Sequence, residues 1–200
     1  MVRNSSGAGR PREFEMDEAL DGFVRVFREK GYHATSVEAL SAETGLTAGS
    51  LYKAFSDKRA IFIAALDHYI ARRSTGLNAA LARQTSARDK VRALLTFYAA
   101  VSYGREGQRG CLVVGSAVSL ATFDDEVAER VHGSLRRLEL LLRMLLKQGQ
   151  ADGTVSAALS VGGTARCLLC FLQGLRVVGK LGPERASMLR AVEETMRLLD

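Results

Sequence analysis

Apolar residues recur along the chain at intervals of three and four, and no stretch alternates apolar and polar positions as a half-buried strand would. The first such stripe runs from Met16 to Phe27 and ends near Gly31. The sequence holds two prolines, Pro11 and Pro183, so most of it is free of the residue that most strongly breaks helices. The chain is therefore predicted to be all-α.

Two short helices are predicted after the first stripe. Thr35 followed by Glu38 has the spacing of a capping box, and Gly45 supplies the turn that would end the helix opened there. Thr47 can cap a second short helix that holds Leu51. Two short helices joined by a tight glycine turn within about twenty residues form a helix-turn-helix, in which the second helix can enter the major groove of DNA.

Longer helices are predicted from residue 56 onward. Ser56 and Asp57 can cap a helix that continues to Ile70, and a glycine-rich stretch at 102–110 should break the pattern. The range 160–180 is apolar on nearly every side, which predicts burial all round, partly against a second subunit. The last two helices would then form a four-helix interface in a homodimer. The later helices are expected at 86–98, 111–120, 127–147, 160–180 and 184–199.

The domain organisation follows from these elements. We expect a flexible N-terminal arm at 1–13, a three-helix helix-turn-helix DNA-binding domain at 14–60, and a helical ligand-binding and dimerisation domain at 61–200. A length of 200 residues with 47% hydrophobic content is sufficient for two folded domains. The first residues hold no apolar stretch, and the longest weakly polar run, at 111–121, is too short to cross a membrane, which predicts a cytoplasmic protein.

The net charge gives little information about DNA binding. The 28 basic and 22 acidic residues leave an excess of +6, but residues 1–60 hold nine of each and are neutral. Within this neutral part, Lys53, Lys58 and Arg59 face only Asp57 locally. Basic charge is thus clustered where it can meet phosphate.

Three runs of residues resemble the tetracycline-repressor (TetR) family: Gly31 to Leu40, the turn Thr44 to Thr47, and Ser50 to Lys58. The resemblance extends over about Phe14 to Tyr69. It implies a homodimeric transcription regulator, commonly a repressor, that a small effector releases from a pseudopalindromic DNA operator. The two recognition helices of such a dimer lie about 34 Å apart, one turn of DNA.

The residues expected to contact DNA come from the short helices and from the start of the helix that follows. Hydroxyls and small side chains at a helix start allow close approach to phosphates and base edges, and Tyr and Lys side chains can bind phosphate. Plain capping is the alternative for Thr35 and Ser36, and core packing is the alternative for Tyr52. Arg10 and Arg12 of the arm can enter a minor groove. The expected set is Thr35, Ser36, Thr47, Ala48, Gly49, Ser50, Tyr52, Lys53 and Lys58.

Two positions weaken this interpretation. Ala54 stands where the family frequently has a histidine, and Glu38 would repel a phosphate if it pointed at DNA.

The family also places its effector pocket among the middle helices, and the aromatic character of that region suggests a small, mostly apolar ligand. The candidate lining residues are Phe97, Tyr98, Tyr103, Cys111, Phe123, Phe171 and Gln173.

Cysteine placement leaves one alternative function open. Cys111 follows a glycine-rich loop that carries Arg105 and Arg109, whose positive charges would favour a reactive thiolate, so a redox or electrophile sensor is possible. Packing in the core is the other interpretation of Cys111. Cys167 and Cys170 have the C-x-x-C spacing but are flanked by leucines and phenylalanine, which predicts buried apolar packing.

A third alternative is a helical ligand-binding protein or an enzyme that uses the helix-turn-helix only for packing. The three histidines, His33, His68 and His132, are far apart in the sequence, and no serine lies in a G-x-S-x-G turn. We therefore expect no enzymatic activity, no metal site and no cofactor.

Overall fold

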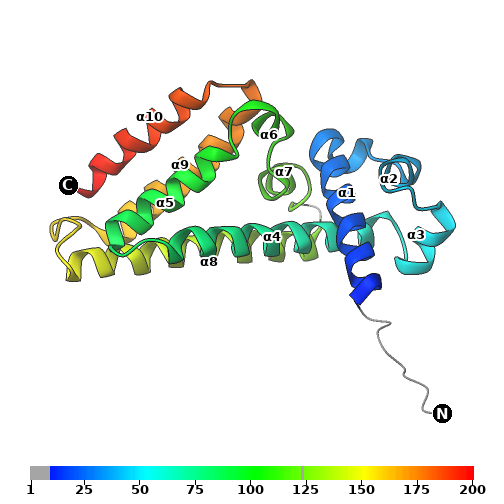
Figure 1. Cartoon of the computed structure of the whole chain (residues 1–200), viewed down its shortest axis with the longest axis horizontal. Coiled ribbons are helices and arrows are strands. Elements are labelled where there is room, and N and C mark those ends of the chain that lie inside the picture. Colours follow the sequence, from blue (N-terminus) through cyan, green and yellow to red (C-terminus); the bar gives the residue numbers. More distant parts are fainter. Residues whose placement is uncertain (1–9, 123) are drawn as a thin grey trace, which may run out of the picture. The chain divides into compact units, whose positions relative to one another are not determined.

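The computed structural model describes residues 10–122 and 124–200, and side chains from residue 15 on. Every regular element in this part of the chain is a helix (Figure 1). The helices form two compact units, which divide between Tyr69 and Ile70, inside α4 (Lys58–Ala82). Most of the expected arm, including the side chains of Arg10 and Arg12, lies outside the described residues, as does Phe123 of the expected pocket.

The first unit contains α1 (Arg10–Ala34), α2 (Val37–Thr44), α3 (Ala48–Ala54) and the first half of α4. Gly31 takes φ 77°, a conformation that favours glycine, and it interrupts the regular helix of α1. This confirms that the first stripe ends there. Gly45 likewise has φ 71° at the end of α2 and makes the turn to α3.

Aromatic side chains join α1 to α4 in this unit. The ring of Phe27 lies edge-on to that of Phe62, with centroids 5.0 Å apart, and the ring of Tyr32 is 5.1 Å from Phe62. Gly22 lets α1 approach α2 closely, because a Cβ there would lie 2.7 Å from Thr44 Cγ2. The apolar stripe of α1 is therefore packed from Ala19 to Phe27, whereas Met16 at its start is 40% exposed.

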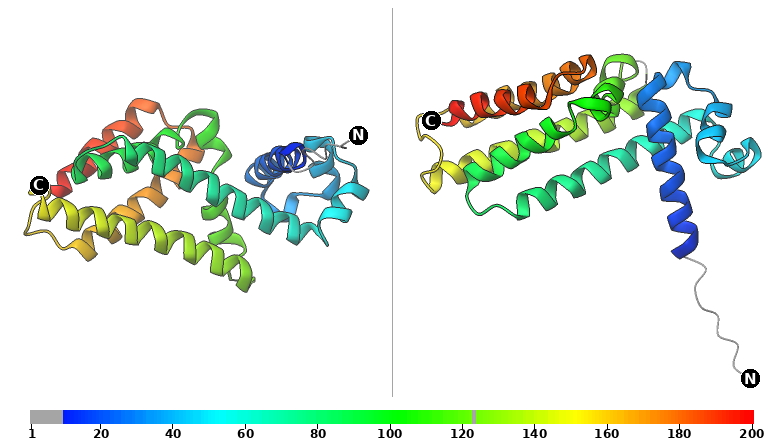
Figure 2. Two further views of the ribbon diagram at one scale, coloured as in Figure 1. Left: turned by 60° about the horizontal axis from the view of Figure 1, so that its bottom comes forward. Right: turned by 45° about the horizontal axis from the view of Figure 1, so that its top comes forward.

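The second unit contains the rest of α4 and the helices that follow it. Within it, α8 packs lengthwise against α9, and α5 contacts α8, α9 and α10 (Figure 2). The expected break at 102–110 is confirmed, because α5 ends at Ala100, and a short separate helix forms inside this stretch. The elements are α5 (Ala87–Ala100), α6 (Gly104–Arg109), α7 (Leu112–Ser119), α8 (Asp125–Ala151), α9 (Val161–Val178), η1 (Gly179–Leu181), α10 (Arg185–Met196) and η2 (Arg197–Leu199).

Ion pairs fix the direction of the helices around α5. Arg88 pairs with Asp200 at 2.6 Å and Arg92 pairs with Glu193, so α10 runs antiparallel to α5. Because α9 precedes α10 through the η1 turn, α9 runs parallel to α5. The C-terminal ends of α5 and α9 accordingly lie together, where a Cβ on Gly179 would be 2.6 Å from the Ser102 carbonyl oxygen.

The second unit leaves apolar surface exposed on α8 and α9. The side of α9 that carries Leu168 and Leu172 is buried, whereas Cys167 and Cys170 are exposed, so the expectation that these cysteines are buried is wrong within this chain. The exposed apolar surface formed by α8 and α9 is hereafter the α8/α9 face. Its residues are Leu140, Met144, Cys167, Cys170, Gly174, Val177, Val178 and Leu181.

The last helix is already packed within its own subunit. Met188, Val192, Met196 and Leu199 of α10 and η2 are buried in the core of the second unit. Their stripe is therefore not available to a partner, and the expectation that the last two helices form the dimer interface is wrong for α10. The exposed apolar stripes belong to α8 and α9 instead.

One helical segment among the described residues, Val161–Leu181, is long and apolar enough to cross a membrane by length and composition, with mean hydropathy 1.3. It is longer than the run at 111–121 that stood out in the sequence. One side of this segment packs on α5 and α8, as in the core helix of a folded domain. Its exposed side is part of the α8/α9 face.

Candidate DNA-binding and effector sites

The start of α3 is exposed over a continuous surface. Thr47 is the N-cap, and its Oγ1 accepts a hydrogen bond from the Ser50 backbone N–H at 3.1 Å. The hydroxyls of Thr47 and Ser50 are also hydrogen-bonded to each other at 3.0 Å. Residues 45–50 are all exposed. The cap thus orders the first turn while leaving its outer side open to a large partner.

The middle of α3 separates a packed side from an open side. Leu51 is 1% exposed and packs in the core, whereas its neighbour Tyr52 is 53% exposed. Tyr52 is therefore not a core residue in this fold. Lys53 and Ala54 are exposed as well. We call the open surface formed by Thr47, Ala48, Gly49, Ser50, Tyr52 and Lys53 the α3 face.

The start of α2 differs from the expectation by one residue. Ser36, not Thr35, is the N-cap, because Ser36 Oγ accepts from the Ala39 backbone N–H at 3.2 Å. Thr35 is only 2% exposed, and its hydroxyl donates to the Gly31 carbonyl oxygen at 2.6 Å. The expected Thr35 cap is wrong for this reason, and the buried hydroxyl of Thr35 is not placed to meet phosphate.

The carboxylate of Glu38 is hydrogen-bonded to the start of α2. Its own backbone N–H and the Ser36 hydroxyl both donate to the carboxylate, and these hydrogen bonds hold the pKa of Glu38 below its usual value. The charge therefore complements the helix N-terminus. The Ser36 hydroxyl is consequently engaged in two hydrogen bonds within α2, although Ser36 itself is exposed.

Lys58 connects α4 to the segment between α1 and α2. Its Nζ donates to the carbonyl oxygens of Tyr32 and Thr35, at 3.1 and 3.0 Å, and lies 4.5 Å from the centroid of the Tyr32 ring. The ammonium group was expected to face phosphate. The structure instead gives it two backbone partners, so Lys58 acts first as a positioning residue for the start of α2.

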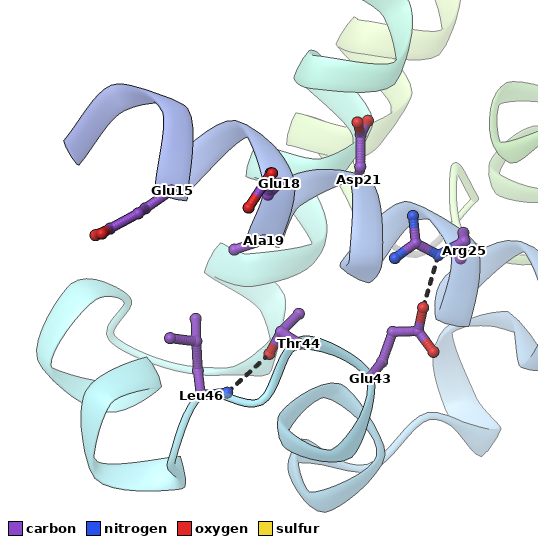
Figure 3. A pocket seen from close by; sticks show the side chains of 8 residues that line it. All are labelled: Glu15, Glu18, Ala19, Asp21, Arg25, Glu43, Thr44 and Leu46. Carbon is purple, nitrogen blue, oxygen red and sulfur yellow. Dashed lines mark hydrogen bonds and ion pairs between the residues drawn. The ribbon is translucent and has the colours of Figure 1, made fainter. Parts of the chain in front are cut away.

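An acidic groove of about 500 Å³ lies between α1 and the end of α2 (Figure 3). Arg25 pairs with Glu43 at 2.6 Å on its wall, and Leu46 forms the side next to α3. Its carboxylates repel phosphate, so this side of the first unit is unsuited to DNA. The groove is lined by Glu15, Glu18, Ala19, Asp21, Arg25, Glu43, Thr44 and Leu46.

The expected effector pocket falls in the core of the second unit. Phe97, Tyr98, Tyr103 and Phe171 are half-buried and pack against this core. Burial raises the pKa of the Tyr98 hydroxyl, although the positive charges of Arg73 and Arg176 oppose the shift. Gln173 has a buried amide nitrogen. The four aromatic side chains therefore pack around the same core.

The three cysteines have different environments. Cys111 is half-buried at the N-cap of α7, and its charge when ionised would influence Tyr98. It therefore lies near the expected pocket. Cys167 and Cys170 belong to the α8/α9 face and are solvent-accessible in the single chain.

Arg73 is a half-buried cation with a buried Nη2 atom, and it is not among the residues predicted from the sequence. Its guanidinium carbon lies 4.6 Å from the centroid of the Phe97 ring and 5.2 Å from that of Tyr98. Its spacing in the sequence could have identified it, because Arg73 stands four residues before Leu77 and eight before Leu81, and both leucines are buried. An arginine on an apolar helical stripe indicates a packed charge.

Two family models match most of the described chain. Residues 19–65 match the model for bacterial regulatory proteins of the tetR family. Residues 87–195 match the model for the tetracyclin repressor-like C-terminal domain. The matched regions contain the α3 face, most of the α8/α9 face and the expected pocket.

Named relatives match over nearly their whole length. The HTH-type transcriptional repressor ComR of Escherichia coli is 29% identical over 193 residues, which are 95% of this chain and 91% of ComR. The uncharacterized HTH-type transcriptional regulator YezE of Bacillus subtilis is 25% identical, over 96% of this chain and all of YezE.

One solved structure shows a similar protein on DNA. It contains a triple cysteine mutant of the TetR family transcriptional regulator CifR in complex with a 26-bp double-stranded operator. The identity is 28%, both chains are covered completely, and the TM-score is 0.81.

Proposed function

The chain belongs to the TetR family of bacterial regulatory proteins, and from this we propose that it is a homodimeric repressor that binds a pseudopalindromic operator. The α3 face contacts DNA in this proposal, and a small effector bound in the second unit releases the operator. The observation that carries the proposal is the open α3 face, with Leu51 packed and Tyr52 exposed.

The chemistry of the α3 face fits a duplex. Ala48 and Gly49 have small side chains that allow close approach to base edges, and Ser50 offers a hydroxyl that can bond to several bases. Tyr52 and Lys53 can bind phosphate, which positions the protein without reading sequence. The acidic groove lies between α1 and the end of α2, and none of its lining residues belongs to the α3 face.

The relatives support the same function. ComR is named a transcriptional repressor, and CifR has been solved with operator DNA. The chain and CifR match along their entire lengths, so a relative that binds operator DNA has counterparts of both units of this chain. A regulator that acts on DNA in a bacterium works in the cytoplasm.

The α8/α9 face is the proposed dimer interface. Val177 is 55% exposed and Leu181 is 85% exposed. A contiguous patch of exposed large apolar residues usually marks an interaction surface. Leu140 and Met144 of α8 extend the same surface. Two copies related by a two-fold axis would bury this surface in a four-helix bundle.

Effector binding would release DNA by changing the separation of the two α3 helices. A ligand that binds only one arrangement of the dimer shifts the population toward it, and coupling free energies of about 1–3 kcal/mol are typical. The half-buried aromatic side chains around Tyr98 are the proposed pocket wall.

Selection from random duplex DNA tests the proposal. We expect the wild-type chain to enrich one pseudopalindrome, with half-site centres about 10 bp apart. Ser50→Ala should change the preferred base at one position of each half-site, because a hydroxyl that can contact a base edge is removed. Tyr52→Phe should weaken binding to every duplex by a similar factor.

Glu18→Gln is the matched control, since Glu18 lines the acidic groove on α1. The recovered sequence should be the same for this variant and the wild type. Failure of the wild-type chain to enrich any sequence would refute the DNA-binding function.

A further inference from the structure

Three side-chain nitrogen atoms in the second unit are buried without a hydrogen-bond acceptor among the residues that the structure describes: Arg73 Nη2, Gln173 Nε2 and Arg176 Nε, the last on a guanidinium whose other two nitrogens are hydrogen-bonded. All three atoms are inaccessible to solvent. Buried polar groups in folded proteins nearly always have partners, so each such exception requires an explanation. The Arg73 and Gln173 groups both donate, and the first of them is a cation.

Arg73 and Gln173 come from different helices of the second unit. Arg73 of α4 lies over the rings of Phe97 and Tyr98 on α5. Gln173 stands one turn before Arg176 on α9, and Arg176 Nη1 donates to Ser102 Oγ at 3.2 Å. Ser102 in turn donates to the Tyr98 carbonyl oxygen at 2.8 Å. Because α5 and α9 run parallel, Gln173 lies at the level of Tyr98.

The surroundings contain further donors and positive charge. Arg73 and Arg176 both act electrostatically on the Tyr98 hydroxyl. Tyr98 keeps its proton at neutral pH, because burial raises its pKa above the usual value, and it can donate as well. A neutral or cationic ligand would leave the charge of Arg73 unbalanced, whereas an acceptor with one negative charge would balance it.

Apolar space adjoins this cluster. A groove of about 390 Å³ lies between the end of α4 and α5, and Phe97 forms part of its wall. Ala80, Ala93 and Ala100 supply further apolar lining, and the rest of the wall is polar, formed by Arg83, Gln84, Asp89, Arg92 and Thr96. The ring of Phe97 therefore contacts Arg73 and also borders a space that can hold a small apolar body.

We propose that the effector is a small organic acid whose carboxylate accepts hydrogen bonds from Arg73 and Gln173 and whose apolar body packs against Phe97. This inference rests on the proposed function, since it names the ligand class of the effector site. A carboxylate matches the planar guanidinium.

Calorimetric titration of the DNA-free protein tests the ligand class directly. The probes are sodium benzoate, phenylacetate and hexanoate, each paired with its amide. We expect at least one acid to bind about 10-fold or more tightly than its amide, because a hydrogen bond to a charged partner is about twice as strong as a neutral one. The amide keeps the size and the apolar body.

Two variants locate the carboxylate. Arg73→Met should lower the affinity for the preferred acid about 10- to 100-fold and abolish its advantage over the amide. Gln173→Leu should lower the affinity for the same acid by a smaller factor. Arg72→Met is the matched control, because Arg72 is the neighbouring arginine on α4 and is exposed; it should leave the preference for the acid unchanged.

Melting curves without ligand separate binding from folding. Arg73 Nη2 makes no hydrogen bond in the described part of the protein, so Arg73→Met loses only the contacts of the guanidinium with the rings of Phe97 and Tyr98. The methionine side chain can still pack against these rings, and the variant should melt close to the wild type when no acid is present. Gln173→Leu provides an independent test if Arg73→Met does not fold.

The outcomes separate this inference from the proposed function. If no acid in the panel binds more tightly than its amide, or if both core variants keep the wild-type preference, the inference is overturned while operator binding stands. If the protein selects no DNA but binds the acid, the proposed function fails and the ligand site stands.

Discussion

Replacing Lys58 by methionine should destabilise the first unit without removing a phosphate contact. The ammonium of Lys58 donates to the Tyr32 and Thr35 carbonyl oxygens and lies over the Tyr32 ring. Methionine keeps most of the length and apolar stem but cannot donate. The segment before α2 would then lose the two hydrogen bonds that connect it to α4.

The magnitude follows from these three contacts. Buried hydrogen bonds from a charged donor contribute about 1.5–3 kcal/mol each, and a cation over an exposed ring contributes about 0.5–1 kcal/mol. Because Lys58 is only half-buried, water competes for its ammonium, and we expect a net loss of about 2 kcal/mol. For a chain of this length, that lowers the melting temperature by about 4–8 °C.

Melting curves and the salt dependence of DNA binding together form the assay. Lys58→Met should lower the melting temperature and keep the slope of log Kd against log salt. Lys53→Met is the matched control, since Lys53 is exposed on the α3 face: it should keep the melting temperature and reduce the slope by about one. An unchanged melting temperature with a reduced slope for Lys58→Met would show that Lys58 binds phosphate, and would refute the reasoning.

Three further predictions concern packing, assembly and the alternative function. Gly22→Ala should destabilise the first unit by about 1–3 kcal/mol in urea unfolding, because the new Cβ meets the Thr44 methyl at 2.7 Å; unchanged stability would show that α1 and α2 have room. Val177→Arg should convert the dimer to a monomer in sedimentation velocity, and a dimer of unchanged stability would exclude the α8/α9 face. Cys111→Ser should still release DNA with the effector, whereas loss of release only with electrophiles would favour a thiol sensor.

Local signals in the sequence predicted most helix boundaries. Gly31 and Gly45 end helices as expected, because both take a positive φ. Thr47 caps α3, as expected from a hydroxyl residue before an apolar helical stripe. The start of α2 was misplaced because Thr35 and Ser36 both carry hydroxyls, and only the tertiary fold determines which one is buried.

Contacts between distant helices could not be predicted in this way. The sequence of an apolar helix such as α9 does not show which side packs in the core of its own chain and which side is left for a partner. Periodicity therefore did not reveal that Cys167 and Cys170 are exposed. Arg73 and Lys58 are both surface-type residues by composition, and their partners come from other helices. Their roles depend on how α4 packs, which no local pattern encodes.

The spacing of half-sites in the selected operator tests most directly whether a symmetric dimer binds DNA through two α3 faces. Inserting about five base pairs between the half-sites turns one of them to the opposite side of the duplex. The account predicts that affinity falls to that of a single half-site. Unchanged affinity, measured by fluorescence anisotropy, would contradict it.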